Sequence, residues 1–382
     1  MTRLARVIVH HFRHALTPPV TTVMGPMTNR PAILVEVEDE EGATGFGEVW
    51  CNFPPDGDLH RARLAANVLP AALGSVDTNA PFKTFGIVRS FLDRLAIQAG
   101  EPGPIDQVAS AADIAVHDLA ARRSGVPLAD HLRGGEAPVS VPAYASGIAP
   151  EKHEAQMERM RALGYRRFKL RFGFGPNAGI DVLEKVAAAK GQDEILLADA
   201  NQAFSLEEAL GHLGRLEPLG LAWLEEPIRA DEPAGAWQAL AEAASTPLAG
   251  GENLRGEAAF DEAVAGGALK VIQPDICKWG GLSACHAVAR RAVERGLTYC
   301  PHFLGGGVGL VASAHLLAAV GGPGWLEVDS SKNPLLTQFS GGSLALEGDV
   351  FRLPPGPGLG LAVDLAGADE KRVSREERRV RR

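Results

Sequence analysis

Hydrophobic and polar residues repeat in two different ways along this chain, and the pattern changes near residue 135. The first part has short apolar runs separated by turn residues, which indicate a small antiparallel sheet. Longer stretches follow in which apolar residues recur every three or four positions, as in amphipathic helices. The expected strands are Ala5–Phe12, Ala32–Glu38 and Ala43–Val49, and the expected helices are His60–Leu73, Thr84–Ala99 and Ile105–Ser124. Residues 1–135 are therefore expected to form an α+β domain.

Between residues 136 and 350, short apolar strands alternate with amphipathic helices, which predicts a parallel sheet. Eight such units over roughly 200 residues match a (β/α)₈ TIM barrel. A doubly wound open sheet is the alternative, but no glycine-rich dinucleotide turn follows the first strand. The expected strands are Val139–Ala145, Arg167–Phe172, Ile195–Asn201, Ala222–Glu226, Leu248–Glu252, Leu269–Asp275, Thr298–Phe303 and Trp325–Asp329. Residues 351–382 begin irregularly and are expected to leave the barrel.

Composition and charge narrow the class of protein. The chain has 382 residues, of which 46% are hydrophobic, enough for one large core and a smaller one. Its net charge of -9 argues against nucleic acid as a partner, because phosphate binding needs a clustered basic face. The one basic cluster alternates with glutamates at the C-terminus, as in a solvated or frayed tail. Its cations are Lys371, Arg372, Arg375, Arg378, Arg379, Arg381 and Arg382.

Cysteine usage and the N-terminus favour a cytoplasmic protein without a membrane partner. The four cysteines form no CxxC pair, so reduced thiols are expected and a disulfide is not. The first residues are basic, but their apolar run is short and is broken by His10 and His11. That pattern is typical of neither a signal peptide nor a membrane anchor.

Polar residues fall at the ends of six successive expected strands. They follow one another in steps of 26, 27, 23, 27 and 25 residues, about one strand–helix unit each, as Asp199, Glu225, Glu252, Asp275, His302 and Glu327. A barrel keeps its active site at the carboxyl ends of its strands. The spacing therefore predicts that all six side chains meet at one mouth.

The first three of these residues form the expected metal site. A single Asp after a strand is often only a helix N-cap, but Glu is a poor N-cap. Three carboxylates from neighbouring strands would repel one another unless a cation neutralised them. Oxygen ligands alone favour a hard ion, so Asp199, Glu225 and Glu252 are expected to hold Mg²⁺ rather than Zn²⁺.

Two further groups have the character of acid–base residues. Lys169 and Arg171 share one face of their strand, and Phe168, Leu170 and Phe172 share the other, so both cations are expected to point into the barrel. Asp275 and His302 end adjacent strands. An Asp that accepts from imidazole Nδ1–H leaves Nε2 free to act as a base.

Taken together, these motifs resemble the enolase superfamily, and within it the mandelate racemase subgroup. The motifs are Lys169–Arg171, Asp199–Asn201, Glu225–Pro227, Gly251–Glu252, Pro274–Gly281, His302 and Glu327. The resemblance implies that an N-terminal domain caps the barrel mouth, with the tail after about Phe351 returning to the cap. It implies that the loops Thr17–Asn29 and Trp50–Asp58 close over a small carboxylate substrate. It also implies a homo-oligomer, an octamer or a dimer.

The resemblance implies that Mg²⁺ stabilises the enediolate formed when a proton leaves the carbon next to a carboxylate. Glu327 resembles the residue that hydrogen-bonds the other carboxylate oxygen, and it would need to be protonated or shared by a strong donor. In racemases of this kind a lysine stands where this chain has Arg171, and a guanidinium is a poor base. We therefore expect His302, with Asp275, to catalyse dehydration of an acid-sugar-like hydroxycarboxylate.

Two other functions are kept open. Racemisation or epimerisation of an α-substituted carboxylate, a hydroxy acid or an amino acid derivative, would use Lys169 or Arg171 as a second base. A catalytically inactive binding protein is the more distant alternative, against which the complete set of polar residues counts.

Four residues are candidates for substrate contacts: Trp50, Asn52, Phe53 and Asn201. The first three follow directly after an expected strand of the cap, and the rings of Trp50 and Phe53 would pack on the substrate. The alternative is that they only hold the cap on the barrel. Lys278 is expected to pair with a carboxylate of the metal site.

Overall fold

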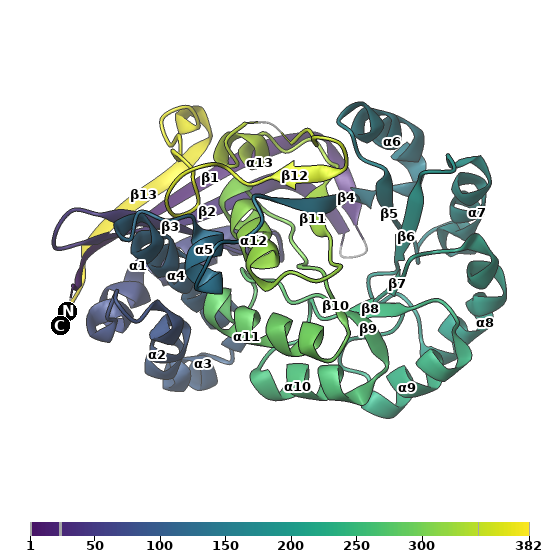
Figure 1. The fold of residues 1–382 in the computed structure, drawn as a ribbon, viewed down its shortest axis with the longest axis horizontal. Coiled ribbons are helices and arrows are strands. Elements are labelled where there is room, and N and C mark those ends of the chain that lie inside the picture. Colours follow the sequence, from purple (N-terminus) through teal and green to yellow (C-terminus); the bar gives the residue numbers. More distant parts are fainter. Residues whose placement is uncertain (1, 23–24, 343, 382) are drawn as a thin grey trace.

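The computed structural model describes residues 2–22, 25–342 and 344–381. At one side of the molecule an antiparallel sheet packs against a group of helices (Figure 1). Within the described residues this sheet has the strand order β13-β1-β2-β3. Its strands are β1 (Leu4–Thr22), β2 (Gly25–Asp39), β3 (Thr44–Val49) and β13 (Arg372–Arg379), and the helices are α1 (Gly57–Ala72), α2 (Thr84–Phe91), α3 (Asp93–Ala99), α4 (Pro102–Arg123) and α5 (Leu128–Arg133).

The expected loop Thr17–Asn29 is largely strand, which corrects the sequence-based expectation. β1 and β2 form one long hairpin in which Val20 pairs with Met27 and Thr22 with Gly25. The pairing register shifts between Ala15 and Val20. Val23 and Met24 lie outside the described residues. The expected helix Thr84–Ala99 is likewise divided, because the backbone leaves the helical region at Leu92.

The C-terminus is not a frayed tail. β13 adds to the sheet antiparallel to β1, with Arg6 opposite Arg379 and His10 opposite Arg375. Arg6 donates to Glu377 at 2.7 Å, so the alternating charges pair along an edge strand. Charged side chains on an edge strand also discourage further pairing. The segment Arg372–Arg379 is therefore an ordered edge strand of the cap sheet and not a frayed tail.

Helix α4 packs so closely on β3 that glycine is required there. A Cβ atom at Gly47 would lie 2.0 Å from the carbonyl oxygen of Ala111, and one at Gly45 would lie 2.2 Å from that of Ala115. Backbone atoms at such distances cannot be displaced without moving the helix. These two glycines therefore set the distance between the sheet and α4.

Replacing Gly47 with alanine is expected to lower the free energy of unfolding by about 3 kcal/mol, since a methyl group must push α4 off β3. Gly86→Ala is the matched control, because Gly86 lies in α2 and nothing is within 4 Å of its added Cβ. That change should raise stability by about 0.5–1 kcal/mol. Urea unfolding of both variants would measure this, and equal stabilities would refute the close packing.

The larger part of the molecule is a curled parallel sheet with helices outside it (Figure 1). In the described part of the chain its order is β10-β9-β8-β7-β6-β5-β4-β11, and β12 (Val350–Arg352) pairs antiparallel with β4. Its parallel strands are β4 (Ser140–Ile148), β5 (Arg167–Arg171), β6 (Ile195–Asp199), β7 (Leu224–Glu225), β8 (Leu248–Gly250), β9 (Leu269–Ile272), β10 (Thr298–Tyr299) and β11 (Leu326–Asp329). The fold is therefore a TIM-type barrel beneath an N-terminal cap.

The first and last parallel strands, β4 and β11, pair with each other, whereas β10 and β11 meet mainly through other contacts. The backbone N–H of Trp325 donates to Cys300 Sγ at 3.3 Å, and that of Phe303 donates to the Glu327 carboxylate at 3.0 Å. The helices that follow the strands are α6 (His153–Ala162), α7 (Ile180–Ala189), α8 (Leu206–Leu216), α9 (Ala234–Ala243), α10 (Glu257–Gly266), α11 (Gly281–Glu294) and α12 (Gly307–Val320), with α13 (Pro334–Phe339) after β11.

Several strands end earlier than the hydrophobic pattern predicts. Glu252, Asp275 and His302 come two or three residues after β8, β9 and β10, not within them. Backbone conformation explains part of this, because Gly251 has a φ of +133° that takes the chain out of the ladder. These side chains are thus placed by turns at the strand ends.

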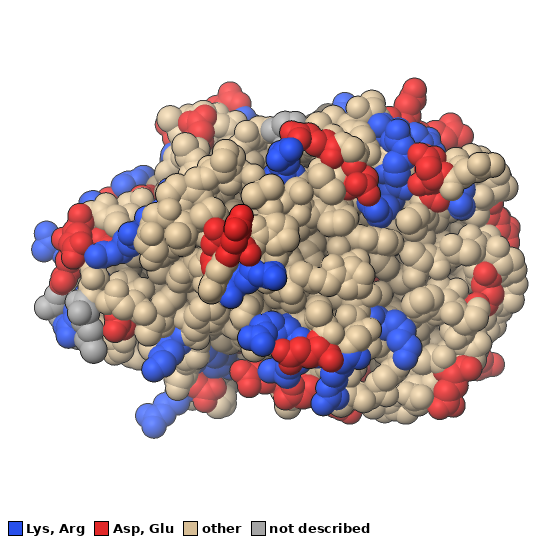
Figure 2. Space-filling model, in the orientation of Figure 1, with Lys and Arg blue, Asp and Glu red and all other residues tan. Residues whose placement is uncertain are grey.

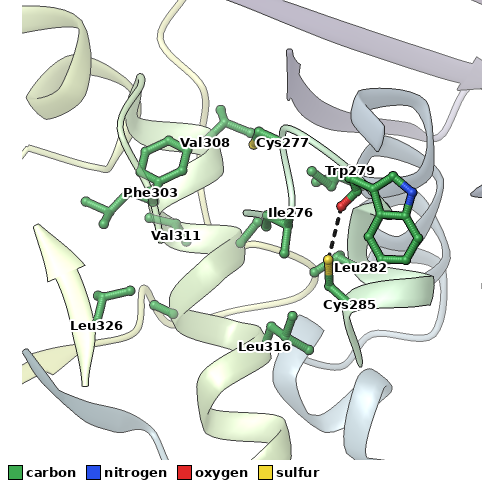
Figure 3. Close-up of a cluster of buried hydrophobic side chains, with 14 of the residues drawn as sticks. Ile276, Cys277, Trp279, Leu282, Cys285, Phe303, Val308, Val311, Leu316 and Leu326 are labelled. Atoms are coloured by element: carbon green, nitrogen blue, oxygen red, sulfur yellow. Dashed lines mark hydrogen bonds between the residues drawn. The ribbon is translucent and has the colours of Figure 1, made fainter. Parts of the chain in front are cut away.

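A buried apolar cluster supports two of these turns (Figure 3). Ile276 and Trp279, which follow Asp275, and Phe303, which follows His302, belong to this cluster; Trp279 lies beside Leu282 and Cys285 of α11, and Phe303 lies beside Val308 and Val311 of α12. Cys285 Sγ also donates to the Trp279 carbonyl oxygen at 3.1 Å. The segments that carry Asp275 and His302 are therefore anchored in the core.

On the face shown in Figure 2, lysines and arginines are interspersed with aspartates and glutamates. Among the described residues, no helix is both long and apolar enough to cross a bilayer.

Candidate active site

The barrel mouth holds a cavity of about 370 Å³, roofed in part by the cap. It is lined from the barrel by residues of several strand ends and from the cap by Trp50, Phe53, Gly103 and Gln107. Eight predicted site residues line it: Trp50, Phe53, Arg171, Asp199, Asn201, Glu252, His302 and Glu327. Of the described residues, none between 17 and 29 lines this cavity.

Lys169 lies at the centre of the carboxylates. Its Nζ donates to Glu225, lies 2.7 Å from Glu327 and is 3.8 Å from Asp199. Burial disfavours the ammonium, but these three carboxylates outweigh it and hold the pKa of Lys169 well above its usual value. As predicted, Lys169 and Arg171 face the barrel interior, and Lys169 there is a fixed positive charge.

Glu225 lies deeper than Asp199 and is held by three donors. Besides Lys169, Trp223 Nε1 donates to it at 3.1 Å and Gln273 Nε2 at 2.7 Å. Burial raises the pKa of Glu225 to about 7, with Asp199 and Glu327 adding to the effect.

Asp199 ends β6 and is oriented by the turn that follows it. Asn201 donates to it from its backbone N–H at 2.8 Å and from its amide at 3.1 Å. Asn201 adopts a φ of +48°, which an asparagine tolerates better than most residues. Burial raises the pKa of Asp199, and the charge of Glu252 raises it further. Asn201 therefore orients the Asp199 carboxylate, and it also lines the cavity.

His302 and Asp275 form the predicted dyad. His302 Nδ1 is 2.8 Å from an Asp275 oxygen, and the other Asp275 oxygen accepts from the backbone N–H groups of Cys277 and Lys278. His302 Nε2, expected to be free, instead lies 2.7 Å from Glu252. Burial disfavours the imidazolium, yet Glu252 and Glu327 outweigh it and hold the pKa of His302 well above its usual value. The expectation of a free Nε2 is therefore wrong for this structure, in which His302 and Lys278 both lie against Glu252.

Glu252 and Glu327 complete the ring of carboxylates. Burial opposes the ionisation of Glu252, but His302 and Lys278 outweigh it and hold its pKa well below the usual value. Lys278 Nζ lies 3.1 Å from Glu252, as expected from the sequence. Glu327 accepts from Ser146 and lies against Lys169, so a strong donor shares this carboxylate.

The described residues hold no ready-made group of three or more His, Cys, Asp or Glu side chains that could bind a metal ion. Lys169, Lys278 and His302 instead neutralise the carboxylates of the predicted metal site. Nevertheless the donor chemistry fits Mg²⁺. Asp199, Glu225 and Glu252 supply only oxygen atoms, come from adjacent strand ends, and interact closely enough to shift one another's pKa.

The cap contributes an aromatic wall. Trp50 and Phe53 line the cavity with their ring centroids 6.4 Å apart, and Lys278 Nζ lies 4.9 Å from the centre of the Trp50 ring. Asn52 lies beside the cavity, and its amide donates to the Leu304 carbonyl oxygen at 2.6 Å. Trp50 and Phe53 are thus placed to touch a ligand, while Asn52 ties the cap to the loop after His302.

Sequence reasoning missed several residues that hold the site in shape. Trp223 and Gln273 lie two positions before Glu225 and Asp275, so strand alternation already indicated that they point inward. Glu48 of β3 could not be predicted in this way, because it lies in the cap and is not part of the regular spacing of polar residues at the barrel strand ends. It is buried and accepts from the backbone N–H groups of Gly306 and Gly309, and burial raises its pKa to about 7. The cap therefore holds the N-terminus of α12 through a carboxylate.

A TIM-type barrel with a cap over its mouth and polar residues at successive strand ends has the architecture of a capped-barrel enzyme. Comparison with known proteins identifies the family. Residues 152–367 match the enolase C-terminal domain-like family, and residues 4–133 match the N-terminal domain of the mandelate racemase / muconate lactonizing enzyme family. The chain belongs to the enolase superfamily, in its mandelate racemase subgroup.

Individual relatives cover nearly the whole chain. D-galactarolactone cycloisomerase of Agrobacterium fabrum is 29% identical over 97% of this chain and 99% of its own length. A mandelate racemase/muconate lactonizing enzyme from Bordetella bronchiseptica is 47% identical, with a TM-score of 0.89, over 97% of this chain and 99% of that one. A variant of L-talarate/galactarate dehydratase, solved with Mg and L-glucarate, is 26% identical with a TM-score of 0.84, covering 98% of this chain and 93% of that one. The protein is accordingly an enolase-superfamily enzyme, a lyase or an isomerase.

Proposed function

We propose that this protein dehydrates an acid-sugar-like hydroxycarboxylate, removing the proton next to the carboxylate in a Mg²⁺-dependent reaction. The observation that carries the proposal is the His302–Asp275 dyad, whose His302 lines the same cavity as the carboxylates Asp199 and Glu252. The dehydratase solved with Mg and L-glucarate supports both the metal and the substrate class.

Asp199, Glu225 and Glu252 are the proposed ligands of Mg²⁺. When bound, the ion would supply a positive charge at the substrate carboxylate, where negative charge develops as the α-proton leaves. It would also take up charge from Glu252, the carboxylate that does most to keep His302 protonated. Lys169 and Glu327 would face the other carboxylate oxygen.

In the reaction, neutral His302 removes the α-proton through Nε2, while Asp275 holds Nδ1–H and stabilises the imidazolium. The imidazolium then returns that proton to the β-hydroxyl, which leaves as water. The C–O bond breaks as the C=C bond of the enol forms, and the enol takes a proton from solvent to give the 2-keto acid. No oxidant or further reactant is consumed.

Racemisation or epimerisation is the second candidate, because Lys169 lies among the same carboxylates and is carried by a strand well away from that of His302. A racemase would need Lys169 to act as a base. Carboxylates hold Lys169 as an ammonium and His302 as an imidazolium alike, so these charges do not separate the two reactions. Arg171 does, because a guanidinium is a poor second base, and this favours dehydration.

The metal proposal can be tested without a substrate. Titration calorimetry should show one Mg²⁺ site in the wild type and at least tenfold weaker binding in Asp199→Asn, because a charged ligand is lost. The control is Asp193→Asn, an exposed aspartate that pairs with Arg166 outside the cavity and should leave binding unchanged. Equal affinity of Asp199→Asn and wild type would contradict the assignment.

A further inference from the structure

Arg255 is a cavity-lining cation that the dehydration step does not use. It follows Glu252 by three residues, and its side chain is 41% exposed, at the rim of the cavity. Its guanidinium is held from the cap side by Asp106 of α4, with Nε at 2.9 Å and Nη2 at 2.8 Å. A paired but reachable guanidinium of this kind is oriented before any ligand arrives.

The counter-charge of Arg255 is shared. Asp106 is buried and also accepts from Arg89 Nε at 2.6 Å, so one carboxylate serves two guanidinium groups. Arg89 has a second carboxylate partner, Asp93, at 2.9 Å, whereas Arg255 pairs with Asp106. Arg255 thus keeps capacity for another anion.

A second polar group lies beside it. Gln107, the residue after Asp106, also lines the cavity, and its amide oxygen accepts from Arg61 Nε at 2.9 Å. With the oxygen engaged on that side, the amide NH₂ is the group that Gln107 can offer to a ligand. Arg255 and Gln107 therefore form a donor pair on the cap side.

This pair is far around the barrel from the cations of β5. Arg171 is carried by β5, and Arg255 follows β8, three strands further along the sheet. The amides of Asn201, Gln202 and Asn253 line the cavity as well. Lys278 and His302 also line the cavity, but both lie against Glu252. Arg171 and Arg255 thus place a guanidinium on each of two sides with hydrogen-bonding groups between them, as a polyhydroxy acid with charge at both ends would require.

We propose that Arg255, aided by Gln107, binds a second carboxylate at the end of the substrate remote from the α-carbon, so that the enzyme prefers dicarboxylic to monocarboxylic acid sugars. The proposal rests on the proposed function, because it concerns the same cavity. A guanidinium suits this task since its planar fork matches a carboxylate, and Asp106 fixes its orientation from behind.

The test uses pairs of six-carbon acid sugars of equal configuration that differ only at C6, a carboxylate in one and a hydroxymethyl group in the other. Wild-type kcat/KM should be higher for the dicarboxylate. Arg255→Gln should lower it roughly 10- to 100-fold for the dicarboxylate, the loss expected for a hydrogen bond to a charged group, and leave the monocarboxylate within about threefold. Arg255→Lys, which keeps the charge, should lie between.

Arg229→Gln is the matched control, because this arginine is also near the rim but pairs with Asp231 and does not appear in the lining of the described cavity. It should leave both substrates unchanged. An equal loss for both acids in Arg255→Gln would mean that Arg255 only clamps the cap to the barrel, and would overturn the inference. If the wild type turns over both acids equally well, the second-carboxylate inference is overturned but the proposed dehydration stands. If it turns over neither acid, both the inference and the proposed dehydration are contradicted.

Discussion

Replacing His302 with asparagine is expected to lower kcat for dehydration by roughly 10²- to 10⁴-fold, the range of general acid–base catalysis. Asparagine keeps a polar side chain next to Asp275 and Glu252 but cannot carry the proton from the α-carbon to the leaving hydroxyl. The loss should appear in kcat more than in KM. Asp275→Asn should cause a loss in the same direction, because the imidazole would lose the partner of its Nδ1.

The control for this experiment is His153→Asn. His153 begins α6, where its Nδ1 lies 2.7 Å from the Pro150 carbonyl oxygen, outside the cavity lining. Its replacement should leave kcat unchanged. Full activity of His302→Asn, with loss only when Lys169 is replaced by alanine, would show that the base is on the other side of the site.

Replacing Lys169 with methionine is expected to be the most destabilising single change in the site. The side chain is buried, and its loss leaves Glu225, Glu327 and Asp199 without their shared cation. Removing one partner of a buried ion pair costs about 3–5 kcal/mol. Urea unfolding at pH 8 without added metal should show a deficit of this size.

The deficit should shrink as the pH falls to 5. In the variant the unpaired carboxyls bind protons more tightly when folded than when unfolded, so acid favours the folded state. Burial already raises the pKa of Glu225 to about 7 while Lys169 is present, and loss of the lysine can only raise it further. Lys270→Met is the control, since Lys270 is exposed on β9, and it should change stability by less than about 0.5 kcal/mol. A deficit at Lys169 that does not depend on pH would refute this electrostatic account.

Hydrophobic periodicity predicted the barrel well because each strand–helix unit buries one apolar face. All eight barrel strands lie where the pattern placed them, although β7 and β10 are only two residues long. The pattern could not reveal where each ladder stops, since Glu252 and His302 follow apolar residues but lie in turns. It predicted the core of β1 and β2 but missed their extension through the hairpin, and it missed β13. β13 is held by long-range pairing with β1, which one segment of sequence does not show.

The site was predictable to the extent that strand alternation and spacing determine which way a side chain points. Lys169, Arg171, Asp275 and His302 lie as the spacing indicated, and the close contact of Nε2 with Glu252 was not foreseen. Strand alternation and spacing within the barrel could not predict the contacts made by the cap. Glu48 meets Gly306, and Asp106 meets Arg255, only because the cap folds back over the barrel.

Charge balance links these observations. The same carboxylates that suit a divalent cation are held by Lys169, Lys278 and His302 when only protein charges surround them. A cation at Asp199, Glu225 and Glu252 would release His302 from Glu252, so the proposed metal site and the proposed base depend on each other. Changes at either should therefore affect both.

Proton NMR of the reaction in D₂O with Mg²⁺ tests the central claim most directly. An acid sugar turned over by the wild type should lose its α-proton signal while a 2-keto acid forms, and the product should carry deuterium from solvent at C3. That result requires α-proton abstraction followed by loss of the β-hydroxyl. Deuterium at the α-carbon with inverted configuration, and without any keto acid, would contradict dehydration and identify the enzyme as an epimerase.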